Sequence, residues 1–210
     1  LLLIGPHGTG KSLLLTRVAE ALGLEFRHYN ASLLNFDDLV GFPLPNKDGS
    51  LDYVQTPAAI WGAGAVIFDE VSRCRPDIQN KLFPIVHERR AQGILLESLR
   101  YRWAAMNPPL TDESDDGYIG SEPLDPALAD RFAFIVEMPL WESLSEVDQL
   151  DIIRATDTSS APSGAASLRT ATATSKATIS ALQETMGDAL AVYVRTLVAL
   201  LAQSGVHLSP

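Results

Sequence analysis

The sequence predicts an α/β fold, in which helices cover both faces of a parallel sheet, followed by a smaller all-α lobe. Three observations lead to this prediction. Short apolar runs alternate with helical patterns over residues 1–139, a glycine-rich turn joins the first run to the first helix, and only helical patterns follow Pro139. We therefore expect an α/β core at residues 1–139 and an all-α lobe at residues 140–210.

Strands are expected where short apolar runs end at a residue that breaks or ends a strand. The first run stops at Gly5-Pro6, the third continues into Asp69-Glu70, and the fourth ends at Asn107-Pro108. Continuous apolar runs are typical of strands that are buried on both faces of a parallel sheet. The expected strands are Leu1–Ile4, Leu24–Tyr29, Ala63–Phe68, Leu99–Met106 and Ala133–Met138.

Helices are expected between these strands, and two of them carry recognisable end signals. Gly23 follows the first helix in the position of a C-cap. Asp125 precedes the last of these helices as an N-cap, and Pro126 takes its first position. The expected helices are Lys11–Leu22, Ser32–Leu39, Pro76–Arg90 and Pro126–Arg131.

The all-α lobe is expected to contain helices on both sides of a linker. Ser143-x-x-Glu146 has the pattern of a capping box and would open a helix that ends near Arg154. Residues 155–174 are rich in Ser, Thr, Ala, Pro and Gly, which we interpret as an exposed linker or a mobile loop. The two further helices, separated by Gly187-Asp188, are Ser175–Met186 and Ala189–Gln203.

Composition and charge limit the classes of function. The chain is 46% hydrophobic and 20% charged, which is typical of a soluble globular protein. Its net charge of −10 argues against a surface that binds nucleic acid non-specifically. The single cysteine, Cys74, cannot form an internal disulfide, so we expect a reducing, cytoplasmic compartment.

The distribution of apolar residues indicates whether the chain spans a membrane and whether the sequence is part of a longer protein. The longest apolar stretch, Ala189–Ala202, is interrupted by Arg195 and falls short of the roughly 20 residues that span a bilayer, so no membrane span is expected. The chain starts directly in the apolar run Leu1–Ile4, without a charged leader or a cleavage site. We therefore expect the sequence to be a piece of a longer protein.

The segment Gly5-Pro6-His7-Gly8-Thr9-Gly10-Lys11-Ser12 is a complete G-x-x-x-x-G-K-S pattern between a strand and a helix. Its glycines let backbone N–H groups wrap a polyphosphate, and the helix N-terminus adds a positive dipole end. Lys11 would reach the β- and γ-phosphates, and the Ser12 hydroxyl would bind Mg²⁺. A chance match in a chain of this length has odds of roughly one in a hundred. This phosphate loop therefore predicts binding of ATP and Mg²⁺.

Two acids follow the strand at Ala63–Phe68, at the edge of the sheet where ligands bind in open α/β folds. Asp69 would hold Mg²⁺ through its water shell, and Glu70 would orient and polarise the attacking water. The alternative is an acidic strand end that is simply solvated. The phosphate loop, about 60 residues upstream, favours the functional role.

Two further polar residues complete the candidate site. Asn107 follows the strand Leu99–Met106 and could stand between the acids and the γ-phosphate, with an ordinary Asn-Pro turn as the alternative. Arg131 ends a short helix and could reach the nucleotide of a neighbouring subunit, an arginine finger being worth about 10³–10⁵ in kcat. The alternative is a surface ion pair worth at most ~1 kcal/mol. The residues alone leave these two interpretations of Arg131 even.

In this order the motifs resemble those of AAA+ ATPases of the MoxR group, in the clade that also holds magnesium-chelatase subunits. The resemblance covers residues 5–139 through the segments GPHGTGKS, DDLVGF, VIFDEVSRC, HERR, AAMNP and LADRF. It implies a P-loop NTPase core whose five parallel strands, numbered along the chain, have the order 5-1-4-3-2, and a partial all-α lid at residues 140–210. It also implies ATP hydrolysis at the interfaces of a homo-oligomeric ring, usually a hexamer, with Arg131 as the arginine finger.

The resemblance assigns two more segments. Gly41–Gln55 would be an insertion in the second helix and Ala91–Arg100 a hairpin, and in the family both project toward a central pore. Phe42 and Tyr53 would then contact a partner, although ordinary packing accounts for them equally well. An arginine that the family carries after a Ser-Pro pair of its lid would lie beyond Pro210.

Three functions remain open from the sequence. The first is a motor that couples ATP hydrolysis to remodelling, chaperone-like activation or metal insertion in a partner, and Glu70, Asn107 and Arg131 favour it. The second is a nucleotide-gated assembly scaffold with little turnover. The third is a nucleic-acid-directed ATPase, against which the net charge of −10 argues. In the family the partner is a client or adaptor protein, often with a metal-dependent adhesion-type domain, and these residues do not identify it.

Overall fold

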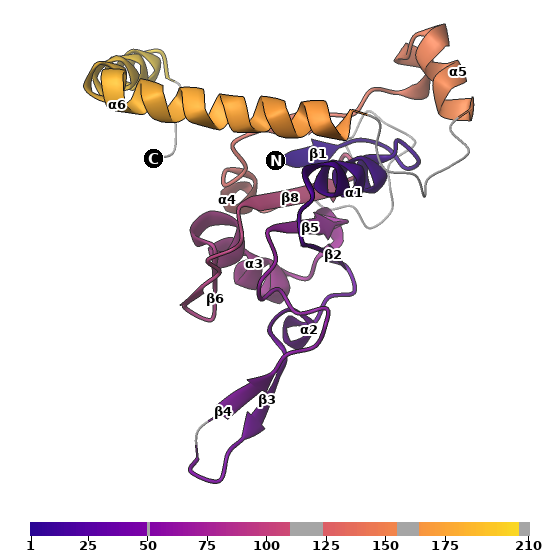
Figure 1. Ribbon diagram of the computed structural model, residues 1–210, viewed down its shortest axis with the longest axis vertical. Helices are drawn as coiled ribbons and strands as arrows, with labels where there is room; N and C mark the ends of the chain where they lie inside the picture. The colour runs from indigo at the N-terminus through magenta and orange to yellow at the C-terminus, as the bar shows by residue number, and fades with distance from the viewer. Residues whose placement is uncertain (50, 110–123, 155–163, 206–210) are drawn as a thin grey trace. The chain divides into compact units, whose positions relative to one another are not determined.

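The computed structural model describes residues 1–49, 51–109, 124–154 and 164–205. The chain forms two compact units, Leu1–Pro162 and Ser163–Pro210. The first unit contains the sheets and the helices that pack on them, and the second consists of one long helix in its described part (Figure 1).

The main sheet of the described part of the chain has five strands, which are β1 (Leu2–Ile4), β2 (Phe26–Asn30), β5 (Ala65–Asp69), β8 (Tyr101–Met106) and β9 (Ile135–Glu137). Their spatial order is β2-β5-β8-β1-β9, and every pair of neighbours is parallel. The strand order 5-1-4-3-2 is therefore confirmed. Because all strands run the same way, the ends of β1, β5 and β8 that precede the phosphate loop, Glu70 and Asn107 lie at one edge of the sheet.

Side chains alternate along these strands, so the sheet carries a hydrophobic cluster on each face. Helix α1 (Lys11–Leu22) packs against the face that presents Ala65, Ile67 and Trp103. The other face presents Val66 and Phe68 and belongs to the larger cluster.

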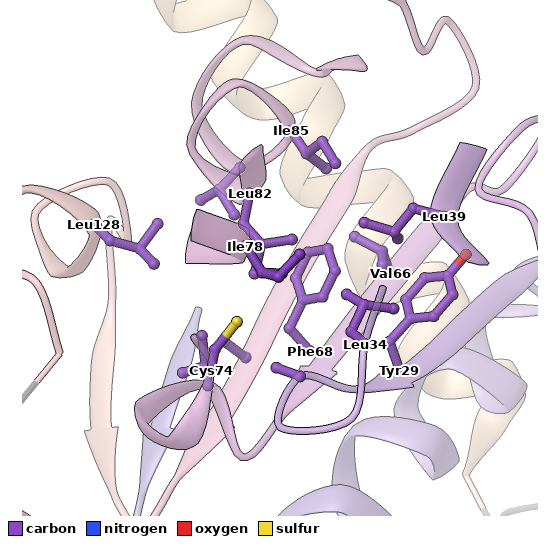
Figure 2. Close-up of a cluster of buried hydrophobic side chains, with 14 of the residues drawn as sticks. Tyr29, Leu34, Leu39, Val66, Phe68, Cys74, Ile78, Leu82, Ile85 and Leu128 are labelled. Carbon is purple, nitrogen blue, oxygen red and sulfur yellow. The ribbon is translucent and has the colours of Figure 1, made fainter. Parts of the chain in front are cut away.

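Three helices also contribute to the larger cluster, namely α2 (Phe36–Val40), α3 (Pro76–Glu88) and α4 (Pro126–Ala129). Figure 2 shows Ile78, Leu82 and Ile85 of α3 gathered beside Phe68. Burial of these side chains fixes β5 between two layers, and with it the acids at the end of the strand.

Three of the expected helices are shorter than the sequence indicated, and one of them, α3, ends at Glu88 instead of Arg90. The prediction that the second helix starts at Ser32 was wrong, because Asn35 caps a helix that begins at Phe36. The backbone N–H of Asn35 donates to Oδ2 of Asp38 at 3.0 Å, completing a capping box. Asp125 caps α4 as predicted by accepting from the backbone N–H of Ala127 at 2.7 Å, but this helix ends two residues earlier than expected.

Two antiparallel hairpins lie in the segments for which the family resemblance implied an insertion and a hairpin. The first pairs β3 (Phe42–Pro45) with β4 (Leu51–Val54) and extends from the end of α2 (Figure 1). The second pairs β6 (Arg90–Ala91) with β7 (Ile94–Leu95). Phe42 is half-exposed, whereas Tyr53 is partly buried against the larger cluster. The structure thus gives Tyr53 a packing role and leaves Phe42 at the surface.

The helix α5 (Glu146–Arg154) forms as predicted, but its capping residue was assigned wrongly. Ser145, not Ser143, caps it: the Ser145 hydroxyl accepts from the backbone N–H of Asp148 at 3.2 Å and donates to the Asp148 carboxylate at 2.6 Å. Ser143 instead ends a short 3₁₀ turn, η2 (Trp141–Ser143).

The second unit corrects the prediction of a linker followed by two helices. One continuous helix, α6 (Ala165–Gln203), contains the second half of the expected linker 155–174 and passes through Gly187-Asp188 without a break. Residues 155–163 lie outside the described residues. By length and composition α6 could cross a membrane, with a mean hydropathy of 1.4 in its most apolar window. These two properties do not separate a membrane span from a helix that packs on protein, so the expected absence of a span stays a prediction.

Candidate functional site

The candidate site lies at the carboxyl edge of the sheet, where β1 leads through the phosphate loop into α1. Gly8 and Gly10 have φ values of 75° and 76°, which are left-handed and favour glycine. Gly10 is also the N-cap of α1, so no side chain caps the N–H groups of its first turn. This helix N-terminus is therefore able to bind an anion through its backbone.

The ammonium group of Lys11 is held beside this loop by three oxygen atoms. It donates to the carbonyl oxygens of Gly5 and Pro6, both at 2.7 Å, and to Oδ1 of Asn107 at 3.2 Å. Burial lowers the pKa of Lys11, and the nearby Asp69 and Glu70 act in the opposite direction. The lysine thus lies where the sequence predicts contacts with the β- and γ-phosphates.

The carboxylate of Asp69 receives hydrogen bonds from three elements. Its Oδ2 accepts from the hydroxyl of Ser12 and lies 3.5 Å from Nε2 of His28, and its Oδ1 accepts from the backbone N–H of Glu70 at 2.9 Å. Burial alone would raise the pKa of Asp69, but the hydrogen bonds from His28, Ser12 and Glu70 outweigh it and hold that pKa below its usual value. Asp69 is therefore fixed as an anion beside Ser12.

The backbone of Glu70 is unusual for a residue with a side chain. Its φ of 53° and ψ of 40° are left-handed, at the point where β5 passes into the 3₁₀ turn η1 (Val71–Arg73). Such conformations cost about 1–3 kcal/mol and concentrate at functional sites. Its Oε2 lies 3.4 Å from Nη1 of Arg73, and both side chains are partly exposed. The strained turn places the Glu70 carboxylate at the rim of the pocket.

Asn107 is 6% exposed and contacts both sides of the phosphate loop. Beyond its contact with Lys11, its amide nitrogen lies 3.4 Å from Nε2 of His7. The side chain therefore links the end of β8 to two residues of the loop, which is the position that the sequence predicts for a contact with the γ-phosphate.

These residues enclose one pocket of about 190 Å³. It is lined by His7, Gly8, Gly10, Lys11, Ser12, Leu13, Asp69, Glu70, Met106 and Asn107. The other predicted loop residues do not line the pocket but hold the loop in place. The Thr9 hydroxyl donates to the carbonyl oxygen of Pro6 at 2.9 Å, and the backbone N–H of Gly5 donates to the carbonyl oxygen of Met106 at 3.2 Å.

The donor set fits ATP together with Mg²⁺. The loop and Lys11 offer N–H and ammonium donors to phosphate oxygens, while Ser12 and Asp69 bring two hard oxygen ligands together. Among the described residues, no group of three or more His, Cys, Asp or Glu could hold a metal ion alone. That is expected for Mg²⁺, which proteins bind through one or two side chains plus substrate phosphates.

Arg131, the remaining predicted site residue, does not join this pocket. It lines a second pocket with Tyr101 and Trp103, near the start of β8, whereas Met106 and Asn107 line the first pocket at the other end of that strand. The rise along a strand puts these two ends roughly 17 Å apart. Arg131 therefore does not act on the nucleotide of its own chain in this arrangement.

Sequence reasoning missed His28 as a neighbour of Asp69. A polar residue within the second expected strand was the only available signal. Its meaning depends on β2 pairing with β5, in a register that sets His28 opposite Ile67 and Asn30 opposite Asp69. That pairing joins segments about 40 residues apart and is not visible in either segment by itself.

Comparison with known proteins identifies what the chain resembles. The model of one protein family, described as "AAA domain (dynein-related subfamily)", matches residues 1–132. No curated protein matches the sequence. Among solved structures, that of a "putative ATPase" from Cytophaga hutchinsonii is similar to this one, with a TM-score of 0.54 and 23% sequence identity. The match covers 77% of this chain and 47% of the other, so this chain spans about half the length of that protein, and the likeness shows the fold alone.

Proposed function

This chain belongs to the AAA domain family, dynein-related subfamily, and we propose from the geometry of its site that it binds ATP with Mg²⁺ and hydrolyses it. The observation that carries the proposal is the meeting in one pocket of the loop lysine, an Asp–Ser pair, a strained glutamate and a buried asparagine. These residues follow three strands, β1, β5 and β8, that are far apart in the sequence. They are Lys11, Ser12, Asp69, Glu70 and Asn107.

In this proposal the pocket first binds and orients the triphosphate. N–H groups of the loop and the Lys11 ammonium bind the β- and γ-phosphates, and the Ser12 hydroxyl with Asp69 holds the metal ion. Mg²⁺, when bound, neutralises negative charge on the phosphate oxygens. The Lys11 ammonium gives its three N–H groups to the carbonyl oxygens of Gly5 and Pro6 and to Oδ1 of Asn107, so it exchanges at least one of these contacts for a phosphate oxygen when the nucleotide binds.

Hydrolysis then requires a water molecule in line with the bond that breaks. The Glu70 carboxylate accepts a hydrogen bond from this water and orients it. The Asn107 amide donates a hydrogen bond to a γ-phosphate oxygen or to the water. A bond forms between the water oxygen and the γ-phosphorus. The bond from that phosphorus to the β–γ bridging oxygen breaks, and its electron pair leaves with ADP. One of the two water protons stays on the oxygen that is now bound to phosphorus, and the other passes to the Glu70 carboxylate and from there to solvent.

The test is a Glu70→Gln variant, with Glu142→Gln as the matched control on an exposed 3₁₀ turn. We expect Glu70→Gln to bind ATP with affinity similar to the wild type and to lose almost all turnover, because glutamine keeps the size of the side chain but is a far weaker base. The control is expected to keep both properties. Equal and substantial steady-state rates in Glu70→Gln and wild type would refute the role given to Glu70, and equally negligible rates in both would favour the assembly scaffold.

Assembly into a ring is a further part of the proposal. The separation of Arg131 from the pocket of its own chain supports it, because an arginine of this kind can complete only a neighbour's site. We expect Glu70→Gln with ATP to sediment as a closed oligomer, a hexamer by the family resemblance. A monomer at every protein and ATP concentration would contradict the ring.

The client is proposed only by class. The half-exposed Phe42 on the hairpin of β3 and β4 is a side chain that could contact a protein partner. The more specific MoxR and magnesium-chelatase assignment, a cytoplasmic location and an adaptor with a metal-dependent adhesion-type domain stay proposals. Capture of partners on the ATP-bound Glu70→Gln form, compared with Phe42→Ser in the same background, tests the role of this hairpin.

A further inference from the structure

His28 is a polar residue at the centre of β2, on the face of the main sheet that α1 covers. Because side chains alternate along a strand, it shares this face with Phe26, which packs against the cluster beneath α1. The motifs quoted from the sequence do not include His28, and it is not among the residues that line the nucleotide pocket. Its position in the sheet nevertheless connects it to the site.

The pairing of β2 with β5 brings the imidazole of His28 to the carboxyl end of β5. His28 lies opposite Ile67, and Asp69 follows Ile67 by two residues on the same face. Positions that are offset by two residues on adjacent strands are roughly 7–8 Å apart, a gap that a short side chain does not bridge. The imidazole bridges it, since its Nε2 lies 3.5 Å from Oδ2 of Asp69.

The carboxylate of Asp69 is restrained by donors from three directions. The Ser12 hydroxyl reaches Oδ2 from the start of α1, and His28 reaches the same oxygen from β2. The backbone N–H of Glu70 donates to Oδ1 at 2.9 Å. The terminal torsion of an aspartate is broad by itself, so such partners decide how the carboxylate is oriented.

The contact of His28 with Asp69 is a long hydrogen bond in which the ring donates, because a carboxylate anion can only accept. Burial raises the pKa of Asp69, and among the contacts that lower it the hydrogen bond from His28 is the strongest, ahead of that from Ser12. A neutral imidazole that carries its proton on Nε2 makes this bond, so no positive charge on the ring is needed.

We propose that His28 is a positioning residue for the Mg²⁺ that accompanies the nucleotide, because its Nε2–H fixes the Asp69 carboxylate beside Ser12. The inference rests on the proposed binding of ATP with Mg²⁺ and deepens it. Hydrogen bonds that orient a metal-binding carboxylate from outside are typically worth 10- to 100-fold in metal affinity. The contribution of His28 is therefore to metal affinity, and the contacts of the loop and Lys11 with the phosphates do not depend on it.

The first test measures the coupling between metal and nucleotide in the full chain. The coupling is the ratio of two dissociation constants of a fluorescent ADP analogue, one in EDTA and one in saturating Mg²⁺. His28→Phe keeps an aromatic ring that suits a strand but has no N–H. We expect its ratio to be lower than that of the wild type on the order of 10-fold, the low end of the range because the contact is long, with an unchanged dissociation constant in EDTA.

Two outcomes of this measurement would overturn the proposal. An unchanged ratio in His28→Phe would mean that the contact with Asp69 does not affect metal binding. Equal weakening in EDTA and in Mg²⁺ would mean that the substitution damages the phosphate loop, which is a structural effect and not the positioning of a metal-binding group.

A conservative variant and a matched control isolate the hydrogen bond. In His28→Gln the side-chain amide can donate from nearly the position of Nε2, so we expect most of the wild-type ratio to return. The control is His87→Phe, the same change at an exposed position of α3, and it should keep the full ratio. A loss in His28→Gln as large as in His28→Phe, or an equal loss in His87→Phe, would refute the role given to the His28 N–H.

The dependence of hydrolysis on Mg²⁺ separates positioning from a part in the chemical step. We expect His28→Phe to need on the order of 10-fold more free Mg²⁺ for half-maximal velocity, and to keep kcat within a few-fold of the wild type once Mg²⁺ is saturating. A fall in kcat that added Mg²⁺ does not restore would contradict a role in metal affinity.

Failure of this inference is distinguishable from failure of the proposed function. A wild-type chain that binds the nucleotide equally well in EDTA and in Mg²⁺ would count against the proposed site for ATP with Mg²⁺. A wild-type chain with a clear preference for Mg²⁺, and a His28→Phe variant with the same preference, would overturn the role of His28 alone.

Discussion

Truncation of Asn107 to alanine tests the site most directly, because this side chain connects β8 to both ends of the phosphate loop. Its Oδ1 accepts from the Lys11 ammonium at 3.2 Å, and its amide nitrogen lies beside His7. In Asn107→Ala the lysine keeps its two contacts with the loop carbonyls of Gly5 and Pro6. We therefore expect Lys11 to stay in place and the affinity for ATP to change by no more than a few-fold.

The expected effect on catalysis is larger than the effect on binding. A hydrogen bond to a charged group is worth about 1.5–3 kcal/mol, and each 1.4 kcal/mol of transition-state stabilisation is tenfold in rate. If the Asn107 amide contacts the γ-phosphate mainly as charge develops, kcat falls by about 10- to 100-fold while KM hardly changes.

Steady-state hydrolysis and equilibrium binding of a fluorescent ATP analogue, measured on the same preparation, distinguish these outcomes. Asn107→Asp is the companion variant: it keeps an oxygen that accepts from Lys11 but replaces the amide donor with an anion near the γ-phosphate. We expect it to keep the stability of the wild type and to lose at least as much kcat as Asn107→Ala. A wild-type kcat in both variants, or a loss that appears only in KM, would refute the role given to Asn107.

Three further predictions concern stability and are measured by urea denaturation. Gly41→Ala should cost about 1–3 kcal/mol or more, because Gly41 has φ of 97° and a Cβ there would lie 2.5 Å from the carbonyl oxygen of Val54; a wild-type midpoint would contradict this. Leu82→Ala removes a fully buried side chain of the larger cluster and should cost about 2–5 kcal/mol, and a loss below 1 kcal/mol would mean that the cluster repacks. Burial, followed by the charge of Asp77, raises the pKa of Cys74 from 9.0 to about 11, so the folded chain favours the neutral thiol. The resulting stability is present below pH 9 and is lost between pH 9 and 11, so the loss of stability over this range should be smaller in Cys74→Ala than in the wild type.

Strand positions in this fold follow from the sequence because each strand is a buried apolar run that stops at a polar residue, a glycine or a proline. Ala65–Asp69, for example, is apolar up to the acid that ends it, and the alternation of Val66 and Phe68 with Ala65 and Ile67 divides it between the two clusters. The same terminating residues are the site residues, so identifying the strands also located Asp69, Glu70 and Asn107. The order of the strands came only from the family resemblance, since local patterns carry no information on which strands are neighbours.

The wrong predictions of a helix cap, a helix break and a linker arose where two local sequence signals compete. Ser143 and Ser145 both precede an acid by three residues, and only the structure shows that Ser145 forms the cap. Gly187 was taken as a break, but one glycine costs a helix only about 1 kcal/mol relative to alanine, and its neighbours in α6 are strong helix formers. Residues 165–174 were taken as a linker from their Ser and Thr content, although alanine, the best helix former, recurs throughout them.

The partner of His28 was beyond sequence reasoning for a different reason. His28 lies beside Asp69, which is distant in the chain, through the pairing of β2 with β5. Such contacts depend on strand register and on how a helix end packs against the sheet. A single sequence shows the residue types, but not that the fold brings them together.

The position of β8 keeps the two pockets at its ends at a fixed separation. This strand lies between β1 and β5, is hydrogen-bonded on both sides, and is buried from Trp103 to Asn107. Its start lines the pocket that contains Arg131, and its end lines the pocket that contains Lys11 and Asp69. A buried strand with two paired neighbours deforms little, because any shift would break hydrogen bonds and packing together. The distance between the two pockets is therefore set by the core of the sheet.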